Sequence, residues 1–122
     1  MTLAINHFGP FYLTYLLWDS LCKAAEARII NVSSEIHYRA PNDYLTDIEC
    51  ANKSYSSINQ YSTSKLFNVL FTRGLNDLMF RRGIKNMKTA SLHPGVVDTN
   101  FGQGSSFFKC FKCLCCCILI DQ

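Results

Sequence analysis

The stretch that decides the fold is residues 28–34, Arg-Ile-Ile-Asn-Val-Ser-Ser. Its β-branched residues stand between polar flanks, which predicts a short buried strand. Residues 88–93, Lys-Thr-Ala-Ser-Leu-His, predict a second strand, which the turn signal Pro94-Gly95 ends. Both strands finish on polar side chains, and in α/β folds the carboxyl ends of the strands carry the functional sites.

Two helical patterns accompany these strands. Apolar side chains recur at helical spacing from Met1 to about Ala27. A second set of apolar side chains, from Gln60 to about Phe80, forms another broad apolar face. The second pattern ends in two arginines followed by Gly83, a usual helix stop. Residues 35–60 are polar and turn-rich, which predicts a long loop. The order helix–strand–helix–strand indicates α/β layering around a parallel sheet.

Two strands and two helices cannot cover both faces of a parallel sheet. The apolar helices therefore need partners that these elements do not supply, and we expect the chain to be part of a larger unit.

Composition narrows the class of protein. The chain has 122 residues, 48% of them hydrophobic and 17% charged, which is typical of one small globular domain. The net charge of +3 is small and the basic residues are scattered, so no nucleic-acid partner is expected. The seven cysteines are unevenly placed, which indicates a reducing, cytoplasmic setting and not a disulfide framework. The sequence contains no run of 18 or more apolar residues, so no membrane-spanning helix is predicted.

The string Tyr61-Ser-Thr-Ser-Lys65 is the most informative one for chemistry. Residues four apart on a helix project from the same face, one turn from each other. A tyrosine and a lysine at this spacing occur often by chance. On spacing alone, they are more often ordinary residues on a helix surface than catalytic ones.

Three other strings change this balance: Asn6 lies in the first helix, Ser33-Ser34 closes the first strand, and Pro94-Gly95-Val-Val97-Asp-Thr99 follows the second. Together with Tyr61 and Lys65, and in this order, they resemble the pattern of the short-chain dehydrogenase/reductase family. The resemblance covers residues 1 to about 101. Within the family, the sequence is most similar in its pattern of residues to the branch of retinol dehydrogenases and WW-domain oxidoreductases.

The resemblance implies an NAD(P)-dependent enzyme that transfers hydride between the cofactor and an alcohol or carbonyl, with a lipophilic, retinoid-like substrate as one candidate. It makes Tyr61 the catalytic acid/base and Lys65 its partner, which also binds the nicotinamide ribose. Ser34, in preference to Ser33, corresponds to the residue that binds the substrate carbonyl. Asn6 corresponds to the asparagine that supports a proton-relay water.

Two of these roles have an independent physical reason. A phenol has a pKa of about 10, and a neighbouring ammonium lowers it by favouring the phenolate. Pro10 has no N–H, so a helix that runs through it leaves the carbonyl of Asn6 without its usual donor. That free carbonyl would suit a bound water. The other interpretation is a plain proline kink or a helix that starts at Gly9-Pro10.

For the cofactor, NAD or NADP, the resemblance implies contacts with Tyr61, Lys65, Pro94 and Gly95, and further contacts with Val97 and Thr99. No Gly-x-x-x-Gly-x-Gly string occurs. The predicted fold is therefore a partial Rossmann-type, doubly wound, three-layer α/β fold whose N-terminal dinucleotide-binding half is absent, and we expect the chain alone to be incomplete for activity. It is either an incomplete reading of a longer enzyme or an inactive relative that acts as an interaction module.

Residues 102–122 are expected to form a separate tail after the catalytic portion, residues 1–101. Clustered cysteines beside apolar residues suit a peripheral membrane contact through S-palmitoylation, which is one of three interpretations. Cys110-x-x-Cys113 has zinc-like spacing, but the three adjacent cysteines that follow have poor geometry for one ion, so no metal site is predicted. The third interpretation is a low-information apolar end.

A homodimer through the second helix is also open, with Leu70, Phe71 and Leu78 either in that interface or covering the sheet.

Overall fold

A computed structural model describes residues 1–95 of the chain. Val97, Thr99 and the cysteine-rich tail lie outside the described residues, so the predictions made for them stay predictions. The elements in chain order are η1 (Ala4–Phe8), α1 (Gly9–Lys23), β1 (Ala27–Val32), η2 (Glu35–Arg39), α2 (Asp43–Thr46), α3 (Ser57–Arg81) and β2 (Met87–Leu92). Within residues 1–95, none of the helices combines the length and apolar character needed to cross a membrane.

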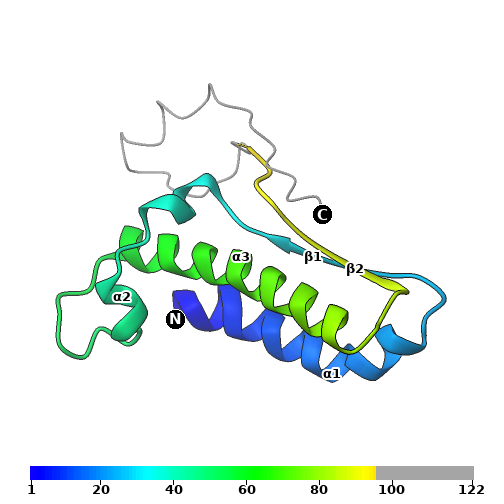
Figure 1. The fold of residues 1–122 in the computed structure, drawn as a ribbon. Helices are drawn as coiled ribbons and strands as arrows, with labels where there is room; N and C mark the ends of the chain where they lie inside the picture. The colour runs from blue at the N-terminus through cyan, green and yellow to red at the C-terminus, as the bar shows by residue number, and fades with distance from the viewer. Residues whose placement is uncertain (96–122) are drawn as a thin grey trace.

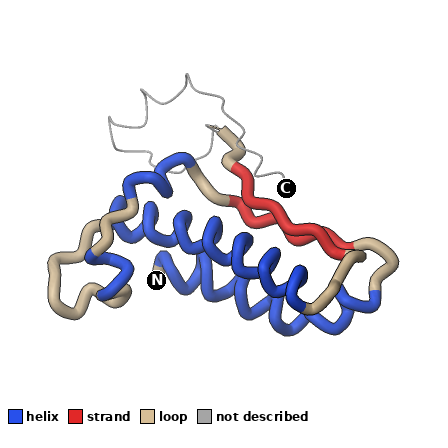
Figure 2. The backbone as a smooth tube through the Cα atoms, viewed as in Figure 1, coloured by secondary structure: helices blue, strands red, loops and turns tan. Residues whose placement is uncertain are grey.

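The two strands form a parallel pair, as the order of the elements predicted. Ala27 pairs with Met87 at one end and Val32 with Leu92 at the other. Parallel neighbours need a crossover connection, and α3 supplies it between β1 and β2. The helices α1 and α3 run side by side along the pair (Figure 1), and the tube view shows both beneath the two strands (Figure 2).

The core lies between this helix pair and one face of the strands. Ala27 and Ile29 of β1 and Met87 of β2 pack against two buried side chains of α3, Leu75 and Met79. The core is completed by partly buried apolar residues from α1, α3 and the connecting segments: Trp18, Leu21, Cys22, Ala24, Phe71 and Ile84. Phe71 therefore covers the sheet, which was one of its two predicted roles.

The opposite face of β1 is not covered by any described element. Side chains along β1 alternate between buried and exposed, and the outward Ile30 and Val32 are 57% and 50% exposed. Fully covered parallel strands normally bury both faces. The expectation that these helices leave one face of the sheet open is confirmed for the described residues.

The helix α3 begins earlier than the sequence predicted. Ser56 is its N-cap, and its hydroxyl accepts a hydrogen bond from the backbone N–H of Asn59 at 3.4 Å. The helix ends before Gly83, whose φ of 66° is in the left-handed region that favours glycine. The prediction of one loop over residues 35–60 was wrong in part, because it contains the single-turn helices η2 and α2.

The first helix opens with a π turn at η1. The N–H of Gly9 donates to the carbonyl of Ala4, five residues back. Pro10 cannot donate to the carbonyl of Asn6, and a π turn is one way for a helix to absorb such a gap. Helical backbone therefore runs from η1 through Pro10, while the regular α-helix begins at Gly9, so each interpretation is right in part.

The other end of α1 is held by the side chain of Asn86, which precedes β2. Its Nδ2 lies within hydrogen-bonding distance of three carbonyls at the helix end, those of Leu21 at 3.3 Å, Cys22 at 3.2 Å and Ala24 at 2.7 Å. The last carbonyls of a helix have no partner within the helix. Asn86 thus joins the end of α1 to the start of β2.

We expect the substitution Asn86→Ala to lower the free energy of unfolding by about 1–2 kcal/mol, since it removes the donor for this helix end. Urea denaturation followed by circular dichroism measures the change. The matched control is Asn52→Ala, which removes an exposed asparagine side chain. Equal denaturation midpoints for the two variants would show that Asn86 does not hold the helix end.

Candidate functional site

The predicted site residues gather where β1 ends. The backbone N–H of Ser33 donates to the carbonyl of Leu92 at 2.8 Å, which extends the parallel ladder past β1 and places Ser34 at its carboxyl end. Tyr61 and Lys65 lie one turn apart near the start of α3. Asn6 lies on η1, and its side chain contacts the same part of α3.

Tyr61 is half-buried, and its side chain is hydrogen-bonded to that of Ser34. Burial raises the pKa of Tyr61 above its ordinary value, and the hydrogen bond to Ser34 opposes this rise in part. The pKa of Tyr61 therefore shifts in the opposite direction to the one expected from Lys65. The ammonium lies 5.5 Å from the centre of the tyrosine ring and has another partner.

That partner is the last carbonyl of β1. Lys65 Nζ donates to the carbonyl oxygen of Val32 at 3.1 Å. Partial burial of the ammonium lowers the pKa of Lys65. Ser33 reaches the same helix differently, because its hydroxyl donates to the backbone carbonyl of Lys65 at 2.8 Å. The two serines thus divide their tasks: Ser33 ties β1 to α3, and Ser34 contacts the phenol.

Asn6 contacts the site through both its side chain and its backbone. Its Nδ2 donates to the hydroxyl of Ser64 at 3.1 Å, and that hydroxyl donates to the backbone carbonyl of Tyr61 at 2.7 Å. The carbonyl of Asn6, which Pro10 leaves without its helical donor, accepts from Nδ2 of Asn68 at 3.1 Å. A carbonyl oxygen has two lone pairs, so this contact uses one acceptor position and leaves the predicted water a second.

The sequence motifs did not single out Ser64, Asn68 or His7. Ser64 is buried, Asn68 is 4% exposed, and His7 Nδ1 lies 3.1 Å from Asn68 Oδ1. The signal that could have found them is a polar row at helical spacing on α3. Residues 61, 64, 68 and 72 are polar and follow one another by three or four positions. The row continues to β1, where Asn31 Nδ2 donates to the hydroxyl of Thr72 at 2.9 Å.

The Pro94-Gly95 turn, predicted to contact the cofactor, lies at the end of β2. Gly95 has a φ of 77°, a conformation that favours glycine. Nε2 of His93, just before the turn, is 4.0 Å from a carboxylate oxygen of Glu35, the residue after Ser34. The start of the turn and the segment after β1 are thus neighbours, and the other predicted cofactor residues, Val97 and Thr99, lie outside the described part of the chain.

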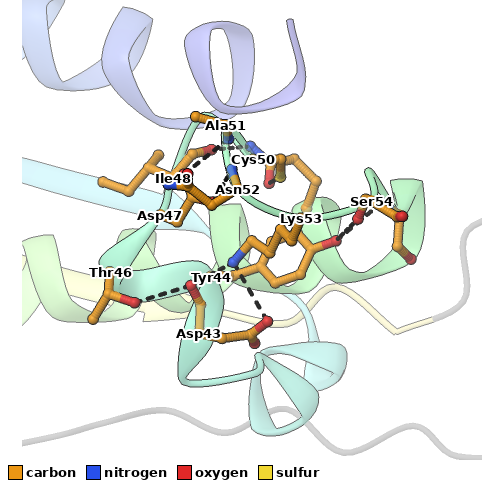
Figure 3. Close-up of polar contacts among 12 residues, drawn as sticks. Asp43, Tyr44, Thr46, Asp47, Ile48, Cys50, Ala51, Asn52, Lys53 and Ser54 are labelled. Atoms are coloured by element: carbon orange, nitrogen blue, oxygen red, sulfur yellow. Dashed lines mark hydrogen bonds and ion pairs between the residues drawn. The ribbon is translucent and has the colours of Figure 1, made fainter.

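The segment before Tyr61 is a folded loop, shown in Figure 3. The hydroxyl of Tyr44 donates to the carbonyl of Ser54 at 3.2 Å, and Lys53 Nζ lies 3.7 Å above the centre of the Tyr44 ring. Backbone N–H groups of Asn52 and Ala51 donate to the carboxylate of Asp47, which lowers its pKa. These local contacts give the loop a defined shape.

A buried glutamine links this loop to the start of α3. Gln60 immediately precedes Tyr61 in α3 and is 7% exposed, and its Nε2 donates to the carbonyl of Ile48 at 3.0 Å. The loop therefore has a fixed attachment one residue before the phenol.

Among residues 1–95, no three histidine, cysteine, aspartate or glutamate side chains come together as metal ligands. The chemistry available at the site is that of a half-buried phenol, a hydroxyl, an ammonium and amide groups. Such a set can bind a carbonyl oxygen and exchange a proton with it.

Comparison with known proteins agrees with this geometry. No family model matches the chain. Human retinol dehydrogenase 12 is 41% identical over 104 residues, which cover 85% of this chain and 31% of that protein. The human WW domain-containing oxidoreductase is 39% identical over 100 residues, covering 77% and 23% of the two chains. A crystal structure of an uncharacterised protein from Mycobacterium paratuberculosis aligns with a TM-score of 0.67 and 33% identity, over 83% of this chain and 35% of that one.

Fold, motifs and relatives agree on one class, the Rossmann-type α/β proteins. The chain belongs to the short-chain dehydrogenase/reductase family, on the side of the retinol dehydrogenases and WW-domain oxidoreductases. It spans about a third or less of the length of these curated relatives.

The contact between Ser34 and Tyr61 predicts the effect of Ser34→Ala. The pKa of Tyr61 is expected to rise further, because the hydrogen bond that opposes its rise is removed. The measurement is an NMR titration of ¹³C-labelled tyrosine, with Tyr61→Phe to assign the signal. Ser33→Ala is the matched control, since its hydroxyl bonds the backbone of Lys65 instead. A Tyr61 pKa that is unchanged or lowered in Ser34→Ala would contradict the assignment.

Proposed function

We propose that residues 1–101 are the catalytic portion of an oxidoreductase that transfers hydride between NAD(P)(H) and an alcohol or carbonyl compound. The observation that carries the proposal is the contact between Tyr61 and Ser34, with Lys65 one turn further along α3. Asn6, which approaches the same turns of α3, is the fourth member of the site.

In the direction of carbonyl reduction, the hydroxyls of Ser34 and Tyr61 would hold the substrate oxygen. Hydride added to the carbonyl carbon places a negative charge on that oxygen, and the phenol of Tyr61 donates its proton to it, which gives the alcohol and a phenolate. Oxidation of the alcohol reverses both transfers. Because burial raises its pKa, Tyr61 is protonated near neutrality, the form needed to donate.

Lys65 is suited to two tasks in this scheme. An ammonium has three donors, and the carbonyl of Val32 takes one of them. The others suit hydroxyl groups such as those of a ribose, and the positive charge stabilises a phenolate that forms at Tyr61. The donor set thus fits a nicotinamide nucleotide, which supplies the hydride when bound, with Pro94 and Gly95 at the neighbouring strand end as further proposed contacts.

The substrate is proposed from the relatives. Two groups of them are named for retinol and for an oxidoreductase with WW domains, and both share about two fifths of the aligned residues with this chain. We therefore propose a lipophilic alcohol or aldehyde of the retinoid kind as the substrate to test first.

A second candidate function has one observation in its favour. Helix α1 exposes large apolar side chains, among them Tyr12 at 60%, Tyr15 at 69% and Leu16 at 58%. Exposed apolar patches of this kind mark interaction surfaces. A non-catalytic interaction module would use this face and would not need the phenol of Tyr61.

Tyr61→Phe separates the two candidates. It removes only the hydroxyl, so turnover of retinaldehyde is expected to fall by about 100-fold or more, the size of a general-acid contribution. The assay follows NADH and NADPH absorbance with this chain joined to the dinucleotide-binding half of a relative. Tyr38→Phe, which alters a tyrosine that is 69% exposed, is the matched control. Full turnover in Tyr61→Phe would overturn the catalytic assignment.

A further inference from the structure

Asn68 makes more contacts between elements of the site than its place in the sequence suggests. It lies on α3 just under one turn beyond Lys65 and is 4% exposed. Its Nδ2 donates to the carbonyl of Asn6 on η1 and to the carbonyl of Val32 at the end of β1, both at 3.1 Å. Its Oδ1 lies 3.1 Å from Nδ1 of His7. One buried side chain thus contacts η1 at two points and β1 at a third.

The orientation of this amide follows from its neighbours. Carbonyl oxygens only accept hydrogen bonds, so the side that faces Asn6 and Val32 must be the NH₂ group. The carbonyl oxygen of Asn68 therefore faces His7 and needs a donor. A neutral imidazole has one N–H, so His7 must carry it on Nδ1.

The ring of His7 is held in place by aromatic neighbours. Its centre lies 5.3 Å from that of Phe67 and 6.0 Å from that of Phe71, and 5.5 Å from that of Phe8. Rings at these distances are in packing contact. An imidazole that cannot turn freely can fix the amide it contacts.

Asn68 shares two of its contacts with proposed site residues. One carbonyl also binds Lys65, and the other belongs to Asn6. The carbonyl of Val32 accepts from Lys65 Nζ as well, and the carbonyl of Asn6 is the one that Pro10 deprives of its helical donor. The place of the lysine ammonium, the backbone at Asn6 and the strand end before Ser34 therefore depend on one amide.

We infer that Asn68, oriented by the Nδ1–H tautomer of His7, is a positioning residue that sets the spacing of Asn6, Lys65 and the end of β1. The inference rests on the proposed function, because it concerns the reaction carried out by that site. Asn68 acts through these groups and not on the substrate itself.

The first test needs no activity. Long-range ¹H–¹⁵N NMR of the wild-type chain, at a pH where His7 is neutral, distinguishes a protonated ring nitrogen from an unprotonated one. The expected result is a proton on Nδ1 and none on Nε2. A proton on Nε2, or a mixture of both tautomers, would overturn the inference.

The second test compares the kinetics of two buried substitutions on α3, measured with this chain joined to the dinucleotide-binding half of a relative. Asn68→Leu keeps a similar volume without hydrogen bonds, and kcat is expected to fall by about tenfold or more with KM little changed, since misplaced catalytic groups slow the chemical step. Thr72→Val removes the buried hydrogen bonds of Thr72 with Asn31 Nδ2 and with the backbone carbonyl of Asn68. It leaves the side-chain amide of Asn68 in place and is expected to keep kcat and KM close to wild type.

Equal effects of the two substitutions on kcat would show that Asn68 has only a structural role. If Asn68→Leu does not fold, Asn68→Asp has the same shape and replaces the amide donor by an acceptor, so the same loss of kcat is expected. Absence of turnover in the joined form with the wild-type residues would contradict the proposed function instead, and the tautomer of His7 would still test the contact with Asn68.

Discussion

The rest of the structure depends on the parallel pairing of β1 with β2. Parallel neighbours cannot be joined by a tight hairpin, so the chain between them must cross the sheet, and α3 makes this crossing. The crossing brings the start of α3 to the carboxyl ends of both strands. Tyr61 thereby contacts Ser34, and Lys65 contacts Ser33, although these serines are far from α3 in the sequence.

The two ends of α3 pack in different ways. Toward its C-terminus, Leu75 and Met79 pack with Ile29 and Met87 in an apolar core. Toward its N-terminus, the buried side chains are polar. Ser64 and Asn68 are hydrogen-bonded to η1 and Asn68 also to β1, whereas the buried hydroxyl of Thr63 has no partner among the described residues. Burying polar groups is unfavourable unless they find partners. Hydrogen bonds are directional and apolar contacts are not. This end of the helix therefore makes fewer hydrophobic contacts, but its distances from β1 and η1 are more closely defined.

Much of this could be predicted from the sequence, for physical reasons. Both strands were placed to within two residues, because β-branched runs with polar ends are a local signal, and the order of the elements gave their parallel pairing. Tyr61, Lys65 and Ser34 were found by their motif. The start of α3 was missed because its cap, Ser56, stands in a polar stretch, and Asn68 because its partners are more than thirty residues away in the chain. The pKa of Tyr61 was predicted in the wrong direction, since burial cannot be read from helical spacing.

The central claim is that polar side chains join η1, β1 and α3 at the carboxyl end of the strand pair. Hydrogen exchange of the side-chain NH₂ of Asn68, followed by NMR in the intact chain, tests it most directly. Buried hydrogen-bonded groups exchange only when the structure around them opens. The account predicts that these protons exchange much more slowly than those of the exposed Asn52. Exchange of Asn68 at the rate of Asn52 would mean that the junction does not form, and would contradict the account.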